Sequence, residues 1–384
     1  MKYRLLFSFL VSCVFSLQCT RLEIHPGTPA AAPEAISVEQ VAKLLSTIPL
    51  EAGHMQEVHD AATASAANGY DEEYRMEDLF RAPGTGVGAS APTKAGTYAH
   101  PLRDALREAF LSTKSSSGGD ASWLDSLALS DVQIYWPYSE SWDGSRQPVI
   151  TYDPGEGALS NEGFLLREDG SVAKVLVDEQ MATERPVWVI NRNSDAEYKT
   201  LELRRREDPS WGQGGGDILV KSPSEDSEFR TLVLRSFCAH RQNDSWFAGA
   251  SEFFVKLGAI EDFVASTEAE MRLYDPSITD FMIVVRRKQV GKELPFNAIL
   301  VSEWSDQLSS CALMMVEDDG GTRTTWKCSA MVKIESKSYG FELEIPLYSR
   351  DDIVWRGSLT RNYIERNSGK SVRFGDVDLV LELI

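Results

Sequence analysis

Acidic residues recur in the turns of the C-terminal half, and their oxygen atoms could bind a metal ion. They form the groups Asn243-Asp244, Glu317-Asp318-Asp319 and Asp351-Asp352. Ca²⁺ takes several oxygen ligands from carboxylates and carbonyls, and loops at one end of a β-sandwich could supply them. The sequence therefore predicts a calcium site built from Asn243, Asp244, Asp318, Asp351 and Asp352. The competing interpretation is that an acidic protein places acidic residues in its turns, as Asp319 does beside Gly320.

A second segment carries four aromatic rings that could contact a ligand. The rings belong to Tyr135, Trp136, Tyr138 and Trp142, beside the carboxylates of Glu140 and Asp143. Exposed aromatic faces stack on sugars and proline-rich peptides, so these four residues are the candidates for ligand stacking. Strand alternation places one of Tyr135 and Trp136 inward, which makes core packing the competing interpretation.

Catalytic motifs are not found among the histidines, cysteines and glycine-rich segments. His54 and His59 are five residues apart on an expected helix, about 140° around its axis, so they cannot chelate one metal ion. Cys238 and His240 share a strand face without a group that would orient a nucleophile. The glycine-rich stretch 83–88 has no lysine and follows a helix, unlike a phosphate-binding loop. No catalytic residue is assigned.

A hairpin around Asp319-Gly320 predicts a disulfide. This pair favours a two-residue turn, and a hairpin centred on it places Cys311 opposite Cys328 at a non-hydrogen-bonded position. Cα atoms there are about 4.5 Å apart, which a disulfide accepts. An oxidising compartment favours the bond between Cys311 and Cys328, and two reduced core cysteines are the alternative.

Helical signals dominate residues 37–114. Ser37 is a capping residue with Gln40 three positions later, and apolar residues follow at helical spacing, which predicts a helix over 38–47. An alanine-rich run predicts a second helix over 51–67, ended by Asn68-Gly69. Pro101 opens a third helix that reaches Leu111.

From residue 130 onward the pattern changes to short β-branched and aromatic runs separated by turn residues, which predicts antiparallel sandwich-like units. The expected strands are 132–136, 149–152, 172–177, 187–190, 231–237, 251–257, 281–287, 298–304, 311–316, 324–334, 341–346 and 377–383. Glycine-rich and serine-rich stretches at 211–216 and 222–224 mark the boundary between a first β unit (120–210) and a C-terminal sandwich-like domain (217–384). The fold class is mainly β with a helical N-terminal region, α+β overall.

The first residues predict export and lipid anchoring. Lys2 and Arg4 precede a short apolar stretch, as in a secretory signal peptide, here 1–18. Cys19 is the preferred acylation site and Cys13 the alternative, since Cys13 has the better motif and Cys19 the better length. An ordinary signal peptide without lipid is the competing interpretation. Residues 19–36, rich in Pro and Ala, then form a tether. No Asp follows either cysteine, which favours the outer membrane.

Composition excludes two classes of function. Among 384 residues, 58 Asp and Glu outnumber 39 Lys and Arg, a net charge of −19, which opposes contact with nucleic-acid phosphates. Mean hydropathy is −0.25, and no stretch after the signal is apolar for long enough to span a bilayer. The membrane is therefore a partner through the acyl anchor alone.

Several segments resemble cell-envelope lipoproteins of Bacteroidetes-type bacteria. The resemblance covers about the first half of the chain and rests on residues 68–74, 79–80, 83–88, 135–144 and 186–191. It implies location and architecture, and it carries over no activity and no site residue.

These observations together favour an envelope-anchored binding or interaction module for a glycan, a peptide or a protein. The alternative is a secreted hydrolase that works through paired carboxylates, for which the sequence offers acids but no diagnostic spacing.

Overall fold

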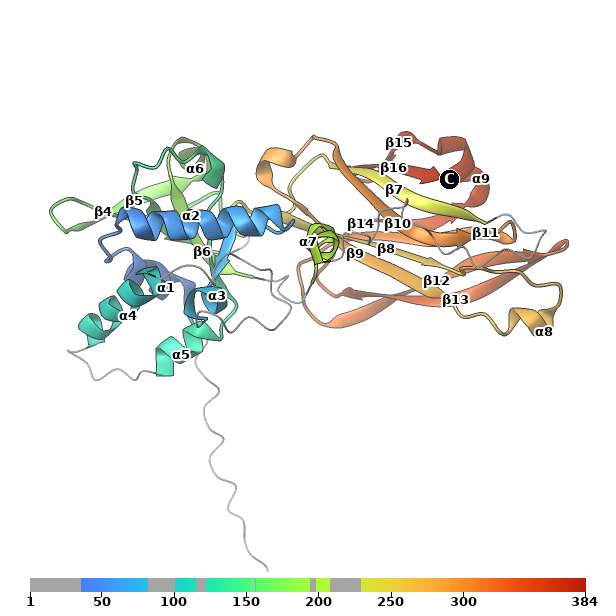
Figure 1. The fold of residues 1–384 in the computed structure, drawn as a ribbon, viewed down its shortest axis with the longest axis horizontal. Helices are drawn as coiled ribbons and strands as arrows, with labels where there is room; N and C mark the ends of the chain where they lie inside the picture. The colour runs from blue at the N-terminus through green and yellow to red at the C-terminus, as the bar shows by residue number, and fades with distance from the viewer. Residues whose placement is uncertain (1–35, 82–100, 115–121, 156, 194–197, 208–228) are drawn as a thin grey trace, which may run out of the picture. The chain divides into compact units, whose positions relative to one another are not determined.

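The computed structural model describes residues 36–81, 101–114, 122–155, 157–193, 198–207 and 229–384 (Figure 1). The predicted signal peptide, both lipidation cysteines, the 83–88 loop and the predicted boundary near 211–224 lie outside these residues. Contacts group Ile36–Ile384 as one unit. Strands make up 42% of the described residues and helices 26%, which confirms the mainly β prediction.

The described helices are α1 (Val38–Leu45), α2 (Ala52–Ala67), α3 (Met76–Phe80), α4 (Pro101–Lys114), α5 (Ser122–Ala128), α6 (Glu179–Glu184), α7 (Leu201–Glu207), α8 (Glu268–Met271) and α9 (Arg361–Asn367), with the 3₁₀ turns η2 (Ser139–Ser141) and η3 (Arg287–Gln289). Several of them begin at a residue whose side chain caps the first turn. Ser37 Oγ accepts a hydrogen bond from Gln40 N at 3.4 Å, as predicted. Gly69 ends α2 with φ +84°, a conformation that glycine adopts without strain.

The first sheet is mixed. Its order is β1 (Glu73–Arg75), β2 (Val132–Tyr135), β6 (Val187–Arg192), β3 (Val149–Tyr152), β4 (Ser160–Leu166) and β5 (Val172–Asp178). The other pairs are antiparallel, but β3 runs parallel to β6. A parallel pair needs a crossover connection, and the segment from β4 to α6 supplies it.

The helical region and the first sheet share one hydrophobic core. Val41 and Leu45 of α1 and Val58 of α2 are buried with Trp188 and Ile190 of β6. The sequence separates residues 37–114 from 120–210 by composition, but the two parts share this core. Together they form one α/β layer pair. The first sheet also contributes Val187 and Val189 to a second cluster, together with Trp246 and Phe247.

The C-terminal part is a sandwich of antiparallel sheets. One sheet has the order β10 (Leu294–Trp304), β7 (Arg230–Ala239), β16 (Val377–Leu383) and β15 (Lys370–Phe374). The other has β13 (Lys337–Tyr348), β12 (Arg323–Ile334), β11 (Leu308–Glu317), β8 (Ser251–Ala259) and β9 (Ser277–Val285), with β14 (Asp352–Thr360) paired to β11. Phe237 and Leu379 from the first sheet and Phe253 and Leu313 from the second are buried in one core between them.

The predicted hairpin register is wrong, and the disulfide is corrected with it. β11 pairs with β12 only near its start, where Leu308 lies opposite Val332. Beyond this point β14 takes the place beside β11, so Cys311 lies opposite Leu359, and Cys328 of β12 lies opposite Leu343 of β13. Both thiols are free, and Cys311 is buried. The sequence preference of a turn predicts pairing only between the two strands that flank it, and it does not take account of a third strand, here β14, that pairs with one of them instead.

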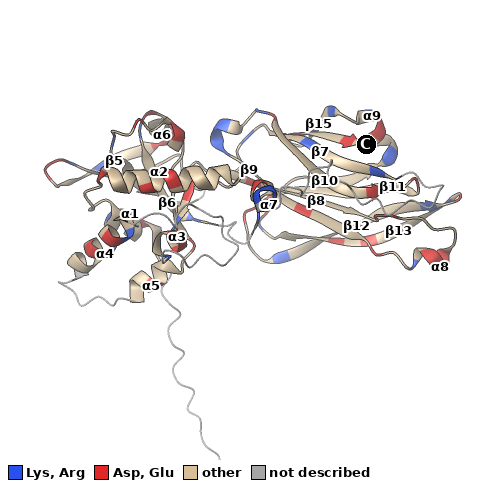
Figure 2. Ribbon diagram, in the orientation of Figure 1, with Lys and Arg blue, Asp and Glu red and all other residues tan. Residues whose placement is uncertain are grey.

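Charge is spread over the molecule. Figure 2 shows acidic residues on α4, α6 and α8 as well as on β12 and β13. None of the described helices combines the length and the apolar character needed to cross a membrane. An acidic surface is therefore general here, and a site needs more than an excess of carboxylates.

Candidate functional site: an acidic pocket

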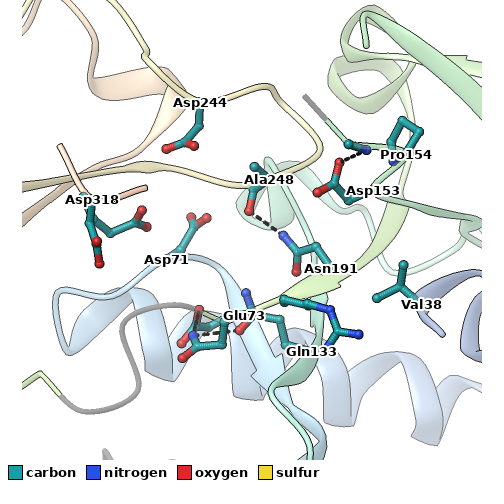
Figure 3. A pocket seen from close by; sticks show the side chains of 14 residues that line it. Val38, Asp71, Glu73, Gln133, Asp153, Pro154, Asn191, Asp244, Ala248 and Asp318 are labelled. Carbon is teal, nitrogen blue, oxygen red and sulfur yellow. Dashed lines mark hydrogen bonds between the residues drawn. The ribbon is translucent and has the colours of Figure 1, made fainter. Parts of the chain in front are cut away.

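A pocket of about 330 Å³ collects carboxylates from many separate segments (Figure 3). Its lining residues are Val38, Asp71, Glu73, Gln133, Asp153, Pro154, Gly155, Asn191, Arg192, Asn193, Asp244, Ala248, Glu252 and Asp318. Six of these carry a carboxylate, and Arg192 is the one Lys or Arg among them. Arg192 forms an ion pair with Asp131 and donates to Ile36 O. The positive charge of Arg192 is therefore largely compensated by groups outside the pocket lining.

Strand ends and the loops that follow them position these groups. Glu73 lies on β1, Gln133 on β2 and Asn191 on β6, which are neighbours in the first sheet. The loop between β7 and β8 supplies Asp244. Since a residue at a strand end is fixed by ladder hydrogen bonds on one side only, its side chain can turn toward a shared space.

Asp71 fixes the entry into β8. Its Oδ2 accepts a hydrogen bond from Ala250 N at 2.8 Å, and its Oδ1 accepts from Glu72 N at 2.7 Å. Burial raises the pKa of Asp71, although these two hydrogen bonds oppose the rise. Gly249 has φ +133°, and a Cβ there would lie 2.9 Å from Asp71 Oδ2. Asp71 therefore holds the backbone closely, and Gly249 permits it.

The loop from Asp244 to Ala248 is held from two further sides. Asn191 Nδ2 donates to Phe247 O at 3.0 Å and to Ala248 O at 2.5 Å. Arg287 Nη2 donates to Asp244 O at 2.6 Å. Asn191 is only 1% exposed, and its Oδ1 has no hydrogen-bond partner among the described residues. One wall of the pocket thus presents a buried acceptor without a donor.

Three carboxylates converge at the position of Asp244, and two of them, Asp244 and Glu252, line the pocket. Ligand oxygens of Asp244, Glu252 and Glu317 all lie within 4.8 Å of one another. Glu317 is 1% exposed. Burial, the hydrogen bond to Asp244 and the neighbouring negative charges raise the pKa of Glu317 to about 11. Burial also raises the pKa of Asp244, while the hydrogen bond to Glu317 and the charge of Arg287 lower it.

The five residues of the predicted calcium site are only partly brought together. Asp244 belongs to the carboxylate triad, and Asp318 lines the pocket and caps Gly320 N. Asp351 accepts from Tyr348 N, and burial raises its pKa. Asp352 is exposed at the start of β14, and Asn243 is held through its backbone N by Ser251 Oγ. The triad is completed instead by Glu252 and Glu317.

Sequence reasoning missed Glu252, Asp71 and Asp153 as pocket residues. Glu252 is the second residue of β8, where alternation marks it as an ordinary outward polar position. Asp71 and Asp153 follow α2 and β3, far from the acidic turns of the C-terminal half. The available signal was weak, namely an acidic residue directly after an element with a buried face.

The predicted stacking residues are corrected in part. Tyr135 and Trp136 are each 1% exposed and belong to the core. Tyr138 and Trp142 are half-buried around a hollow of about 60 Å³, far below the roughly 300 Å³ of a small-ligand site. Tyr138 OH donates to Glu179 at 3.1 Å, and His59 packs against Trp136 and Trp142. The segment is mainly structural.

A second carboxyl pair lies beside this segment. Glu72 is buried, and its oxygens accept from Tyr138 N at 3.1 Å and from Lys288 Nζ at 3.5 Å. Burial and the neighbouring acids raise the pKa of Glu72 to about 8. Partial burial acts against ionisation of Glu140, but its hydrogen bonds with Glu72 and Lys288 lower its pKa to about 2. One proton is therefore held on Glu72 at neutral pH.

Comparisons with known proteins add no relative. No protein-family model, no curated protein and no solved structure matches the chain.

Proposed function

We propose that this chain is an exported, lipid-anchored envelope protein of the outer membrane whose folded body is a binding module. The ligand class that the pocket favours is a small organic cation, such as an amine or a guanidinium. The observation that supports this is the pocket lining, where six carboxylates meet one already paired arginine.

Size and polarity support the same ligand class. A cavity of about 330 Å³ is near the lower end of small-molecule sites, which need a few convergent polar groups. The amides of Gln133 and Asn191 add hydrogen-bonding groups to the carboxylates. A cation that enters such a pocket meets its opposite charge at reduced dielectric, whereas an anion or a sugar phosphate would be repelled.

The alternative is a carboxylate-dependent hydrolase, and the Glu72 and Glu140 pair favours it most. Their pKa values are pushed apart, as in an acid and base pair. However, Lys288 bridges the two carboxyls, and neither lines the acidic pocket. Hydrolysis of a substrate by the wild type that is lost in Glu72→Gln would support the enzyme over the binder.

Asp153 and Asp169 provide a matched test of the pocket. Each accepts a hydrogen bond at its Oδ1 from the backbone N of the second residue along, Gly155 at 3.0 Å and Ser171 at 2.9 Å. Asp153 lines the pocket, whereas Asp169 is exposed and does not line it. Removing either charge should therefore weaken a comparable turn, but only the removal of the Asp153 charge changes the lining of the pocket.

The experiment is thermal unfolding of the full chain in detergent and EDTA with spermidine or N-acetylargininamide, and with uncharged N-acetylcitrullinamide as the control ligand. A ligand at about 100 times its Kd adds about 2.7 kcal/mol to folding stability. We expect the cations to raise the midpoint and N-acetylcitrullinamide to leave it unchanged. Asp153→Asn should weaken the effect several-fold and Asp169→Asn should not. Equal effects of N-acetylargininamide and N-acetylcitrullinamide would rule out a charge-selective pocket.

A further inference from the structure

We propose that Asp244, Glu252 and Glu317 bind a calcium ion at the wall of the acidic pocket. Their ligand oxygens lie within 4.8 Å of one another. Calcium binds oxygen at about 2.3–2.6 Å, so two oxygens on opposite sides of one ion are at most about 5.2 Å apart. The spacing therefore allows all three carboxylates to share one ion.

The burial of Glu317 separates this triad from an ordinary acidic cluster. Glu317 is 1% exposed, and apart from a proton shared between the two carboxyls, Glu317 Oε1 and Asp244 Oδ2 have no hydrogen-bond donor among the described residues. A buried carboxylate oxygen without a donor is costly unless an ion or a proton compensates it. A cation at the triad would satisfy both oxygens together.

Asn191 supplies an independent observation at the same pocket. Because its Nδ2 donates to Phe247 O and Ala248 O, the orientation of the amide is settled and Oδ1 must be the acceptor that remains. This oxygen is buried, has no partner among the described residues and belongs to a residue that lines the pocket. It offers a neutral acceptor to the same cavity that Asp244 and Glu252 line.

The donor set selects the kind of metal. All the groups at the triad are carboxylate oxygens, and hard cations such as Ca²⁺ prefer oxygen over the sulfur and nitrogen that hold zinc. Three carboxylates leave part of a shell of six to eight oxygens unfilled. Asp244 and Glu252 also line the cavity, so the remaining positions face it and are open to water.

The ion would connect three elements. Asp244 belongs to the β7–β8 loop, Glu252 to β8 and Glu317 to the end of β11. The loop is already tied down by Asn191 and Arg287, so little ordering entropy remains to be lost on binding. This proposal does not depend on the organic cation, because the ligand tested is the metal alone.

The test is calorimetric titration of the full chain with CaCl₂, together with Tb³⁺ luminescence excited through tryptophan, since Trp246 is two residues from Asp244. We expect one ion per chain at micromolar to millimolar Kd. Glu317→Gln and Glu252→Gln should each weaken binding at least tenfold, because each removes one charged ligand.

Glu57→Gln is the matched control. Glu57 is 2% exposed like Glu317, but its oxygens accept from Tyr74 OH at 3.0 Å and Leu102 N at 3.1 Å. It should bind calcium like the wild type. Glu317→Gln replaces a buried carboxyl group by an amide of the same shape and should fold, so its far-UV spectrum should match the wild type. No calcium binding by the wild type, or equal Kd values in Glu317→Gln and Glu57→Gln, would overturn the proposal and leave a shared proton between Asp244 and Glu317 as the explanation.

Discussion

Glu317 holds its proton far more tightly in the folded chain than in the unfolded one. Its pKa is about 11 when folded, against about 4.3 for an unperturbed glutamate. Because folding raises the pKa, the contribution of Glu317 to stability is complete below about pH 4 and is lost progressively as pH rises toward the folded value.

Stability without calcium should therefore fall with pH because of this residue. In EDTA, we expect the wild-type unfolding midpoint to drop by several degrees between pH 5 and pH 9 relative to Glu317→Gln, which has no proton to lose. Thermal melts of both proteins across this range measure the difference. Parallel pH curves would show that Glu317 is not the titrating group.

Calcium should reverse this pH dependence. Bound metal displaces the protons of its ligands, so calcium affinity rises with pH. We expect the midpoint difference between millimolar CaCl₂ and EDTA to grow from pH 5 to pH 8 in the wild type and to be small throughout in Glu317→Gln. A calcium effect that is constant with pH would place the ion at carboxylates that are already ionised.

Gly249 is the element-scale feature on which the pocket wall depends. Gly249→Ala would force a Cβ to within 2.9 Å of Asp71 Oδ2, in addition to the strain of φ +133°. The control is Gly291→Ala, which has φ +73° and nothing within 4 Å of the added Cβ. We expect a loss of about 1 kcal/mol at Gly291 and about 2–4 kcal/mol at Gly249. Urea unfolding of the two variants compares these losses. Equal losses would mean that the Asp71 side chain moves away from the added Cβ without a loss of stability.

Because of the register of β11, the described residues contain no disulfide that a reductant could break. Cys238, Cys311 and Cys328 are free, so dithiothreitol should leave the unfolding midpoint unchanged within about 1 °C. Cys311→Ser should cost about 1–3 kcal/mol, because its hydroxyl would be buried in an apolar site. A drop of several degrees on reduction, where removing a disulfide typically costs about 2–5 kcal/mol, would restore the Cys311–Cys328 bond.

Patterns within one element were predictable, and choices between elements were not. Alternation placed Trp326, Cys328, Ala330, Val332 and Ile334 on one face of β12, and these residues are buried or half-buried as predicted. The same reasoning could not foresee that β14 displaces β12 from β11. Strands β4, β14 and β15 were missed, since their burial patterns depend on neighbours distant in sequence.

The sequence predicted the chemistry of the candidate site better than it predicted which residues form it. Acidic turns indicated an oxygen-rich cation site, and Asp244 and Asp318 do meet at one pocket. Glu252 and Asp71 could not be chosen, because only the packing of β8 against β11 and the end of α2 brings their carboxylates there. The prediction of ligand stacking failed because the rings pack internally. Trp136 and Trp142 belong to the core shared with the helices, and Tyr135 and Tyr138 to a second hydrophobic cluster.

Lipid anchoring is the prediction that belongs to the whole molecule. In a bacterial host that labels lipoproteins with palmitate, Cys19→Ser should abolish labelling and release the protein from the detergent phase, whereas Cys13→Ser should remain anchored. Loss of labelling in Cys13→Ser alone would move the anchor to that residue. Labelling that is absent from the wild type would indicate an ordinary signal peptide.

The position of β7 sets the order in which the sandwich can form. β7 lies between β10 and β16, and the pairing of Val377 with Ala239 spans most of the C-terminal part. Its neighbour along the chain, β8, is in the other sheet. Both edges of β7 therefore pair only with strands that are distant in the sequence, and such long-range pairing is slow. Slow closure of this kind would keep the chain unfolded for longer after synthesis, which is the state that the export proposed above would require.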